Sequence, residues 1–595
     1  MMEALKQFVQ HKKFTWLLIG LGTLVILGFY FSKVSDLYIV WELVDEYGYL
    51  ANAAYLSNTK WAWITTLYYG YGYSLWLVPL FWVCNTGVQM IRATVLFNAI
   101  CVVLLFWIQY TLMSKLCKNT NRNIIVAISF ILCMYPYIVS SSLKVICEVL
   151  LTLLVWVCGL LLYQAVETGR WYYYALLALS MVYLFFVHTR AFVFCGVIVI
   201  IFGLAFLLKK ISWKQLLLFA VLALGFLVLG FALKNQIIDG VYSNELFPHI
   251  AEVGNAVGSA GEEISNVTVG NTLSVEYVFK RILGVFTNFS IWHMYTFASR
   301  NLYLLVSTLG MFHVGIIVIF KDVLKEIKSE HKIGSINLVK LLYAVGAVMM
   351  VVATVVQSPG NRDMPAYNFY GRYYEYLIGP AVFIGVVYCI QHRIKLAGIV
   401  ALFATIGVAS WFTYDINNHL NTYELYYDST RLAAFAMFSD KAYVFSDVVR
   451  VVIGFIIVAT VIILVLNNIQ KLRWLIPVVL MTTFLLNDFV IIRNTLSLHA
   501  ENKDDYQVAT YVHSYCPDVD EIYFLSNGYI MTTAYAGIQV LLGQEKLTLI
   551  EENNADILKS GDIFVTFGNN PYVDLIEEDV TKLAETRYYD IFVVE

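Results

Sequence analysis

Long apolar stretches separated by short polar ones run through most of the sequence. A helix needs about 20 predominantly apolar residues to cross the hydrocarbon core of a bilayer. Thirteen segments approach this length: roughly residues 14–31, 92–113, 124–140, 143–163, 171–187, 191–208, 215–233, 302–320, 337–356, 373–390, 396–412, 448–466 and 474–491. The pattern therefore predicts a polytopic α-helical membrane protein with about thirteen transmembrane helices.

Basic residues gather in every second connection between these segments. Cytoplasmic loops carry an excess of Lys and Arg, which sets the orientation of a membrane protein. With the N-terminus inside, the basic groups fall on the cytoplasmic side: Lys6/Lys12/Lys13, Lys115/Lys118/Arg122, Arg170, Lys209/Lys210/Lys214, Lys321/Lys325/Lys328/Lys332, Arg393/Lys395 and Lys471/Arg473. The exoplasmic side then receives four larger loops, residues 32–91, 234–301, 357–372 and 413–447. Loops of this length in a compact domain are usually functional or mobile.

The pattern changes after residue 499, where short alternating stretches replace the long apolar runs. Helices are expected at Asp505–Ser514, Ile530–Leu542 and Val573–Ala584, and strands at Glu521–Leu525, Leu547–Ile550, Ile563–Phe567 and Tyr588–Val594. This order predicts a small exoplasmic α/β domain over residues 500–595, following a membrane domain over residues 1–499. It contains no glycine-rich phosphate loop, so we expect it to support structure or to position an acceptor.

Composition narrows the class of protein. Hydrophobic residues make up 60% of the chain and charged residues 14%, against about 25% charged residues in soluble proteins. The net charge of −3 argues against nucleic acid as a partner. Nine scattered cysteines offer neither a disulfide framework nor a Cys-x-x-Cys metal site. The first apolar run has no small-residue cleavage site, so we expect a retained helix and a multi-pass protein of the cell membrane.

An acidic pair, Asp45-Glu46, lies in the first exoplasmic loop. Carboxylates so close to lipid are costly to desolvate, which suggests a function. If the segment is helical, Glu42, Asp45, Glu46 and Tyr49 fall near one face. Such a cluster can hold a general base at the membrane surface.

Cations and aromatic residues on the same side supply further candidates. Arginine offers a planar fork of donors to phosphate oxygens, and the predicted phosphate-binding residues are Arg372, Arg190, Lys144 and Arg92. Tyr69, Tyr71, Tyr373 and Tyr374 suit a cleft that binds sugar.

Glu148 lies about one turn inside a span, where it either pairs with Lys144 or completes an acidic site. Arg190 has the alternative of an ion pair that holds two helices together.

The layout of these motifs resembles the GT-C superfamily of membrane glycosyltransferases, in the branch of protein O-mannosyltransferases and aminoarabinose transferases. The matching elements are Asp45-Glu46, the turn 69–73 with the short helix Leu75–Phe81, Arg92, the span ending at Lys115, the hairpin from Tyr135 to Glu148, and His188-Thr189-Arg190. Thirteen spans with an exoplasmic C-terminal domain also fit bacterial members. The sequence departs from the family where Tyr and Gly replace its Lys/His-Pro-Pro, and where Glu148 stands for the usual Asp.

This resemblance implies transfer of a sugar from a polyprenyl-phosphate donor to an exoplasmic acceptor, by inversion at the anomeric carbon. The acceptor class stays open between a cell-wall polymer, a glycolipid and a protein. Asp45 would be the general base, because the first acid of the pair has that role in the family, and Glu46 would anchor the loop. Glu148 would belong to the second acidic site.

Alternatives remain. A lipid-linked-sugar flippase or transporter should show repeated halves and charges at mid-bilayer, and the sequence offers no clear repeat. A non-catalytic scaffold accounts less simply for the acid pair. Asp45, Glu148 and Asp363 could share a divalent ion, as in oligosaccharyltransferase relatives, but monophosphate-donor relatives need no ion. We therefore expect no cofactor.

Overall fold

The computed structural model describes most of the chain. The described residues are 12–40, 43–59, 61, 70–242, 290–330, 333–357, 371–395, 398, 407, 445–501, 507–515, 519, 521–526, 532–550, 552–576 and 579–595. Several predicted features lie outside them: the span at 396–412 (except single positions), Tyr69 and the greater part of the loops 234–301, 357–372 and 413–447.

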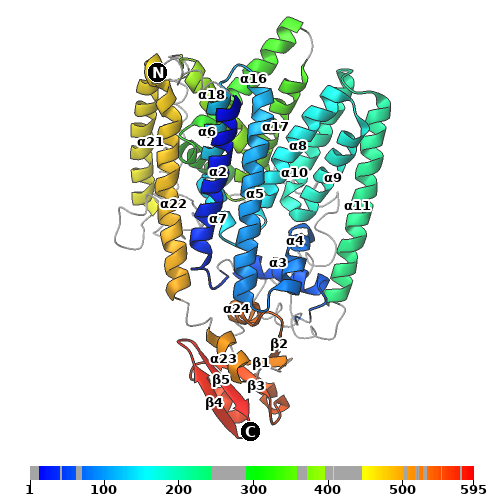
Figure 1. Cartoon of the computed structure of the whole chain (residues 1–595), viewed down its shortest axis with the longest axis vertical. Coiled ribbons are helices and arrows are strands. Elements are labelled where there is room, and N and C mark those ends of the chain that lie inside the picture. Colours follow the sequence, from blue (N-terminus) through cyan, green and yellow to red (C-terminus); the bar gives the residue numbers. More distant parts are fainter. Residues whose placement is uncertain are drawn as a thin grey trace.

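A bundle of long helices forms the larger part of the molecule (Figure 1). Within the described residues, seven helices are long and apolar enough to cross a membrane, or up to nine if two bent helix pairs count as one span each. The helices of the bundle are α2 (Lys12–Val34), α3 (Leu43–Leu56), α4 (Tyr71–Val83), α5 (Gly87–Leu116), α6 (Arg122–Cys133), α7 (Pro136–Ser142), α8 (Glu148–Thr168), α9 (Trp171–Val187), η1 (Thr189–Ala191), α10 (Phe192–Leu207), α11 (Trp213–Tyr242), α15 (Ile291–Ser307), α16 (Met311–Glu330), α17 (Ser335–Gln357), η4 (Glu375–Leu377), α18 (Gly379–Gln391), α21 (Phe445–Asn468), η6 (Gln470–Leu475) and α22 (Ile476–Glu501). The polytopic helical fold is confirmed.

Two of the predicted spans are bent rather than continuous. Residues 124–140 divide into α6 and α7, which meet at 53°. Pro136 is the first residue of α7, and proline has no N–H with which to continue the preceding helix. The span predicted at 302–320 divides into α15 and α16, which meet at 101°. Leu309 and Gly310 both have positive φ there, 49° and 75°, which ends α15.

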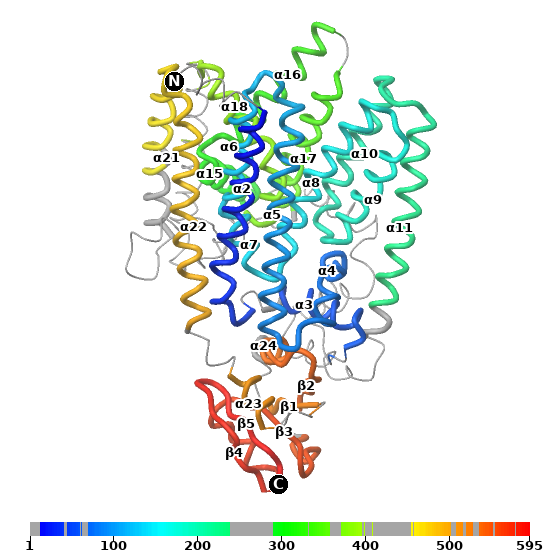
Figure 2. Tube along the Cα trace, viewed as in Figure 1, coloured from blue at the N-terminus to red at the C-terminus, as the bar shows by residue number. Residues whose placement is uncertain are grey.

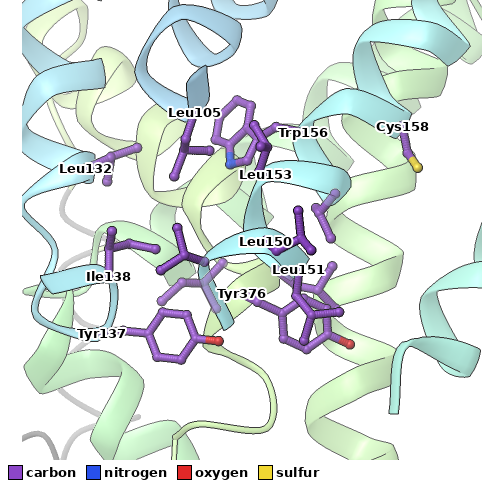
Figure 3. Close-up of a cluster of buried hydrophobic side chains, with 14 of the residues drawn as sticks. Leu105, Leu132, Tyr137, Ile138, Leu150, Leu151, Leu153, Trp156, Cys158 and Tyr376 are labelled. Carbon is purple, nitrogen blue, oxygen red and sulfur yellow. The ribbon is translucent and has the colours of Figure 1, made fainter. Parts of the chain in front are cut away.

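Helix α8 lies at the centre of the bundle. In its most apolar window 67% of the residues are buried, whereas the figure for α11 is 6%. Leu150, Leu151 and Trp156 of α8 belong to one buried cluster with Tyr137 of α7 and Tyr376 of η4 (Figure 3). A helix that is apolar on all sides is typically buried, and Glu148, the first residue of α8, is buried as well.

The short helices α3 and α4 lie at one end of the bundle, and the described N-terminus lies at the other (Figure 1). The short helix expected at Leu75–Phe81 lies within α4. The chain thus brings the acidic pair of α3 to the end of the bundle that faces the C-terminal residues.

Residues 507–595, called the C-terminal domain below, form a mixed sheet with two α-helices (Figure 2). The sheet has the strand order β2-β1-β3-β5-β4. Strand β1 pairs in parallel with β2 and β3, and β5 pairs antiparallel with β3 and β4. The elements are α23 (Gln507–Tyr515), β1 (Glu521–Leu525), α24 (Thr532–Leu542), β2 (Lys546–Ile550), η7 (Glu552–Ile557), β3 (Ile563–Phe567), η8 (Pro571–Leu575), β4 (Val580–Glu585) and β5 (Tyr589–Val594).

Most of the predicted elements of this domain are confirmed, and one is wrong. Residues 573–584 were expected to form a helix, but they form the end of η8 and most of β4. Strand β4 pairs along β5 from Val580 to Glu585 with a register shift between Lys582 and Ala584. Pairing with a neighbouring strand overrides a weak local helical pattern. The predicted boundary at 499/500 falls in the last turn of α22.

Candidate active site

Asp45 and Glu46 occupy the first turn of α3. The N-terminus of a helix carries partial positive charge, which favours carboxylates there. The two side chains have different surroundings. Glu46 is buried, and its Oε1 accepts a hydrogen bond from the Val145 main-chain N–H at 2.7 Å. The side chain of Asp45 is 27% exposed. Glu46 thus ties α3 to the hairpin before α8, as expected for an anchor, while Asp45 stays accessible.

The hairpin between α7 and α8 is held from two sides. The side-chain amide of Asn98, in α5, donates to the carbonyls of Ser142 and Lys144 at 3.3 and 2.9 Å. The Tyr49 hydroxyl of α3 donates to the Cys147 sulfur at 2.9 Å. Because the hairpin leads directly into α8, these bonds fix where Glu148, the first residue of α8, enters the bundle.

Arg372 joins the two acidic positions. Its Nη2 lies 2.5 Å from Asp45 Oδ2, and its Nε donates to Glu148 Oε1 at 2.5 Å. Arg190 adds a second cation, with Nη2 at 2.8 Å from the same Glu148 oxygen. Glu148 is fully buried, and a buried carboxylate is stable only when it is paired. Two carboxylates and two guanidinium groups therefore form a charge-balanced cluster, called the acid–arginine cluster below.

Tyrosines line one side of this cluster. The Arg190 guanidinium carbon lies 5.7 Å from the ring centre of Tyr373 and 5.6 Å from that of Tyr376. A cation at this distance from an aromatic face is attracted by it. Tyr374 is buried, whereas Tyr373 is 36% exposed. Tyr373 is thus more accessible than its neighbour Tyr374.

The other predicted site residues lie in different surroundings. Arg92 donates to the carbonyls of Leu37 and Ser35, at 3.1 and 2.6 Å, and lies over the Tyr38 ring. These contacts hold the end of the loop that follows α2.

Tyr71 donates to the Gly230 carbonyl at 2.8 Å. Lys144 is buried within the hairpin, but the ion pairs of Glu148 go to Arg190 and Arg372 instead. The alternative of a Lys144–Glu148 pair is wrong.

A shared metal ion would compete with an arginine at this site. Asp45 and Glu148 both bind the guanidinium of Arg372, so an ion bound by both carboxylates would have to displace it. No group of three His, Cys, Asp or Glu residues with metal-binding geometry occurs within the described part of the chain. Asp363, the third residue suggested by the sequence, lies outside that part.

Arg300, in α15, is a candidate that the sequence analysis missed. Arg300 is 2% exposed, and among the described residues its Nε and Nη1 have no hydrogen-bond partner. The phenol groups of Tyr373 and Tyr374 lie close enough to interact with its charge. Within the described part of the chain, the Nε and Nη1 of Arg190 and the Tyr374 hydroxyl are also buried without a hydrogen-bond partner. Donors without acceptors are costly when buried, so this side of the cluster is suited to an anion.

A signal for Arg300 existed in the sequence. A lone arginine within an otherwise apolar and aromatic helix is a functional candidate by default in a membrane protein. The helix boundary was predicted at residue 302, so Arg300 was counted as part of a loop.

Comparison with solved structures identifies the architecture. Over 98% of both chains, the protein is similar to ArnT from Cupriavidus metallidurans bound to undecaprenyl phosphate, with a TM-score of 0.51 and 11% identity. The apo form of ArnT gives a TM-score of 0.50 over the same share of both chains, at 11% identity. The protein has a GT-C fold. An oligosaccharyltransferase from Archaeoglobus fulgidus gives 0.48 at 10% identity, covering 94% of this chain and 70% of that one.

The GT-C fold rests on structure alone. No protein-family model matches the sequence, and no curated protein matches it. At 11% identity the likeness extends to the course of the helices and not to individual residues, because side-chain identities differ at most positions. The chemistry of this protein must therefore be argued from its own side chains.

Proposed function

We propose that the protein transfers a sugar from a polyprenyl-phosphate donor to an acceptor at the exoplasmic membrane surface, with inversion at the anomeric carbon. The observation that carries this proposal is the bridge from Arg372 to Asp45 and Glu148. It joins an accessible carboxylate to fixed positive charge at the end of the bundle. The likeness to ArnT, which was solved with undecaprenyl phosphate bound, supports the choice of donor class.

Asp45 is the proposed general base. As the acceptor hydroxyl attacks the anomeric carbon, its proton passes to an Asp45 carboxylate oxygen. The bond from the anomeric carbon to the phosphate oxygen breaks, and the electron pair leaves with the polyprenyl phosphate. Asp45 is more accessible than Glu148, whose side chain has no exposed surface. Arg372 would hold the Asp45 carboxylate in a fixed direction.

The donor phosphate needs cations that are not already occupied. Arg372 uses two nitrogens on Asp45 and Glu148, whereas Arg190 keeps Nε and Nη1 unused. Arg300 keeps two unused nitrogens as well. We assign the phosphate to Arg300 and to the unused side of Arg190, with Tyr373 beside them, because charge-assisted hydrogen bonds to phosphate are strong. Arg92 is not included, since main-chain carbonyls bind it.

The proposed orientation follows from the basic loops. The acid–arginine cluster and the C-terminal domain would lie on the exoplasmic side, and the N-terminus in the cytoplasm. A lipid donor would then enter sideways from the outer leaflet, and the acceptor would enter from water. Membrane lipids and the acceptor complete the expected partners.

A reaction in detergent tests the proposal against the flippase alternative. Lipids extracted from a deletion strain, in which the lipid-linked sugar accumulates and is identified by mass spectrometry, are mixed with purified protein and cell envelopes. A transferase releases polyprenyl phosphate and labels the envelope, even though micelles have no two leaflets. A flippase releases nothing under these conditions, and that result would overturn the proposal.

A further inference from the structure

Helix α24 of the C-terminal domain belongs to two hydrophobic cores. Ala536 and Val540 are buried in the core of the helical bundle, whereas Ile538, Leu541 and Leu542 are buried in the core of the C-terminal domain. In the other direction, Val88 of α5 is buried among residues of the C-terminal domain.

The approach of α24 to α5 is very close. A Cβ atom at Gly87 would overlap the Val540 carbonyl, which belongs to the backbone and has little room to move. Gly87 is the first residue of α5. The C-terminal domain is therefore fitted to the bundle by shape and is not merely tethered to it.

The turn after α24 binds both the segment that follows α3 and the C-terminal end of α4. The Trp61 indole donates to the Gly543 carbonyl at 2.7 Å. The Gln544 amide donates to the carbonyls of Phe81 and Cys84 at 2.6 and 3.2 Å. Gly543 has a φ of 79°, a conformation that glycine adopts without strain. The turn thus binds the segment just after α3 and the end of α4 together.

Trp61 carries this contact to the helix that holds Asp45. Its ring is stacked on the Tyr47 ring with centres 5.5 Å apart, and its edge meets Phe81 of α4 at 5.5 Å. Tyr47 is fully buried and lies two residues after Asp45 in the same helix. Movement of Trp61 would therefore be transmitted to the first turn of α3.

We propose that the turn Gly543–Gln544 and Trp61 are positioning residues, which set the placement of Asp45 through Tyr47. They contact neither substrate in this scheme. The inference rests on the proposed function, because it assigns the C-terminal domain a role in aligning the general base. A catalytic group that is misplaced by about 1 Å can cost about a hundredfold in rate, so a small shift of α3 is sufficient for a large effect.

Two substitutions remove the hydrogen-bond donors of this link while keeping a side chain of similar kind. Trp61→Phe removes the donor to Gly543 but keeps an aromatic ring, and Gln544→Glu keeps the shape but loses the amide donor. Matched controls are Trp82→Phe, at a side chain 70% exposed on α4, and Lys559→Ala, at an exposed position of the C-terminal domain. All variants are made in the full chain.

Hydrogen–deuterium exchange of α3 amides, residues 43–56, gives a readout that does not depend on the sugar. We expect both variants to exchange about tenfold faster there than the wild type. Release of polyprenyl phosphate should fall about 10- to 100-fold in kcat, with the KM for the lipid donor unchanged. The control variants should match the wild type in both measurements.

Two results would overturn this inference. Unchanged exchange in α3 would mean that the turn does not hold the helix. Faster exchange with unchanged kcat would mean that it holds the helix without positioning the base. Asp45→Asn in the same release assay separates the two proposals: if it is inactive while the Trp61 and Gln544 variants remain fully active, the proposed function stands and this inference fails.

Discussion

Arg372 Nη2 lies 2.5 Å from Asp45 Oδ2, and through this contact the segment before η4 holds the first turn of α3. The same guanidinium reaches the buried Glu148 at the start of α8. Asp45, which is partly exposed, thus lies beside the Arg372 guanidinium, whereas Glu148, the second carboxylate of the cluster, has no exposed surface. The following predictions separate the roles of these groups.

Asp45→Asn should lower the release of polyprenyl phosphate by about 10²- to 10⁴-fold, the range that a general base contributes. Folding should change little, because the side chain is partly exposed and Arg372 keeps Glu148 as a partner. Activity and thermal unfolding in detergent measure the two effects. Asp36→Asn, at an exposed position after α2, is the control, and normal turnover of Asp45→Asn would remove Asp45 from the mechanism.

Arg372→Met should reduce both activity and stability, because it leaves the buried Glu148 with Arg190 as its one remaining ion pair. Removing one partner of a buried pair costs about 3 kcal/mol or more. Adding Glu148→Gln should recover part of the lost stability but none of the activity, which a double-mutant cycle of unfolding will measure.

A more exposed ion pair supplies the control for this cycle. Lys340→Met breaks the pair with Asp322, whose side chain is 40% exposed, and should cost at most about 1 kcal/mol. If Arg372→Met is as mild as Lys340→Met, the acid–arginine cluster does not hold the helices together.

Arg300→Met should raise the stability of the protein while weakening its binding of a lipid phosphate. A buried guanidinium with two unpaired nitrogens destabilises the fold by about 1–3 kcal/mol, and methionine removes this cost. The melting temperature in detergent should rise, and the further rise on addition of undecaprenyl phosphate should shrink. A lower melting temperature with an unchanged response to the lipid would show that Arg300 is structural.

Gly385→Ala should destabilise the bundle by about 1–3 kcal/mol through overpacking. A Cβ atom there would meet the Met311 carbonyl of α16, and a Cβ at Gly315 would meet the Ala381 carbonyl of α18. Small residues let membrane helices approach this closely. Gly225→Ala on α11 is the matched control, since a Cβ there meets nothing within 4 Å, and its melting temperature should be equal to or above that of the wild type.

Much of the fold follows from local pattern. Apolar length predicts spans because a bilayer imposes the same requirement on every segment. Strands β1 and β3 were predicted with their observed bounds, because short runs of β-branched and aromatic residues lie between turn residues. Strand β4 was not, because its conformation depends on pairing with β5, which the local pattern does not contain.

The candidate site was partly foreseeable. Asp45, Glu46, Glu148, Arg190 and Arg372 were named as candidates because charge beside lipid is costly and therefore informative. Their partners were not foreseeable, since each ion pair joins different segments of the chain. Pairing with Lys144, four residues away, was one of the two alternatives for Glu148, but Glu148 pairs with Arg372 and Arg190.

The sequence by itself determined that this chain is a polytopic helical protein with acids and cations placed at the ends of its spans, because hydropathy and charge act residue by residue. Only the tertiary structure decided which of these charges form ion pairs with one another. It also decided that, among the described residues, two nitrogens of Arg300 have no hydrogen-bond partner. The physical reason is that burial and pairing are set by distances across the bundle, which arise when the helices pack.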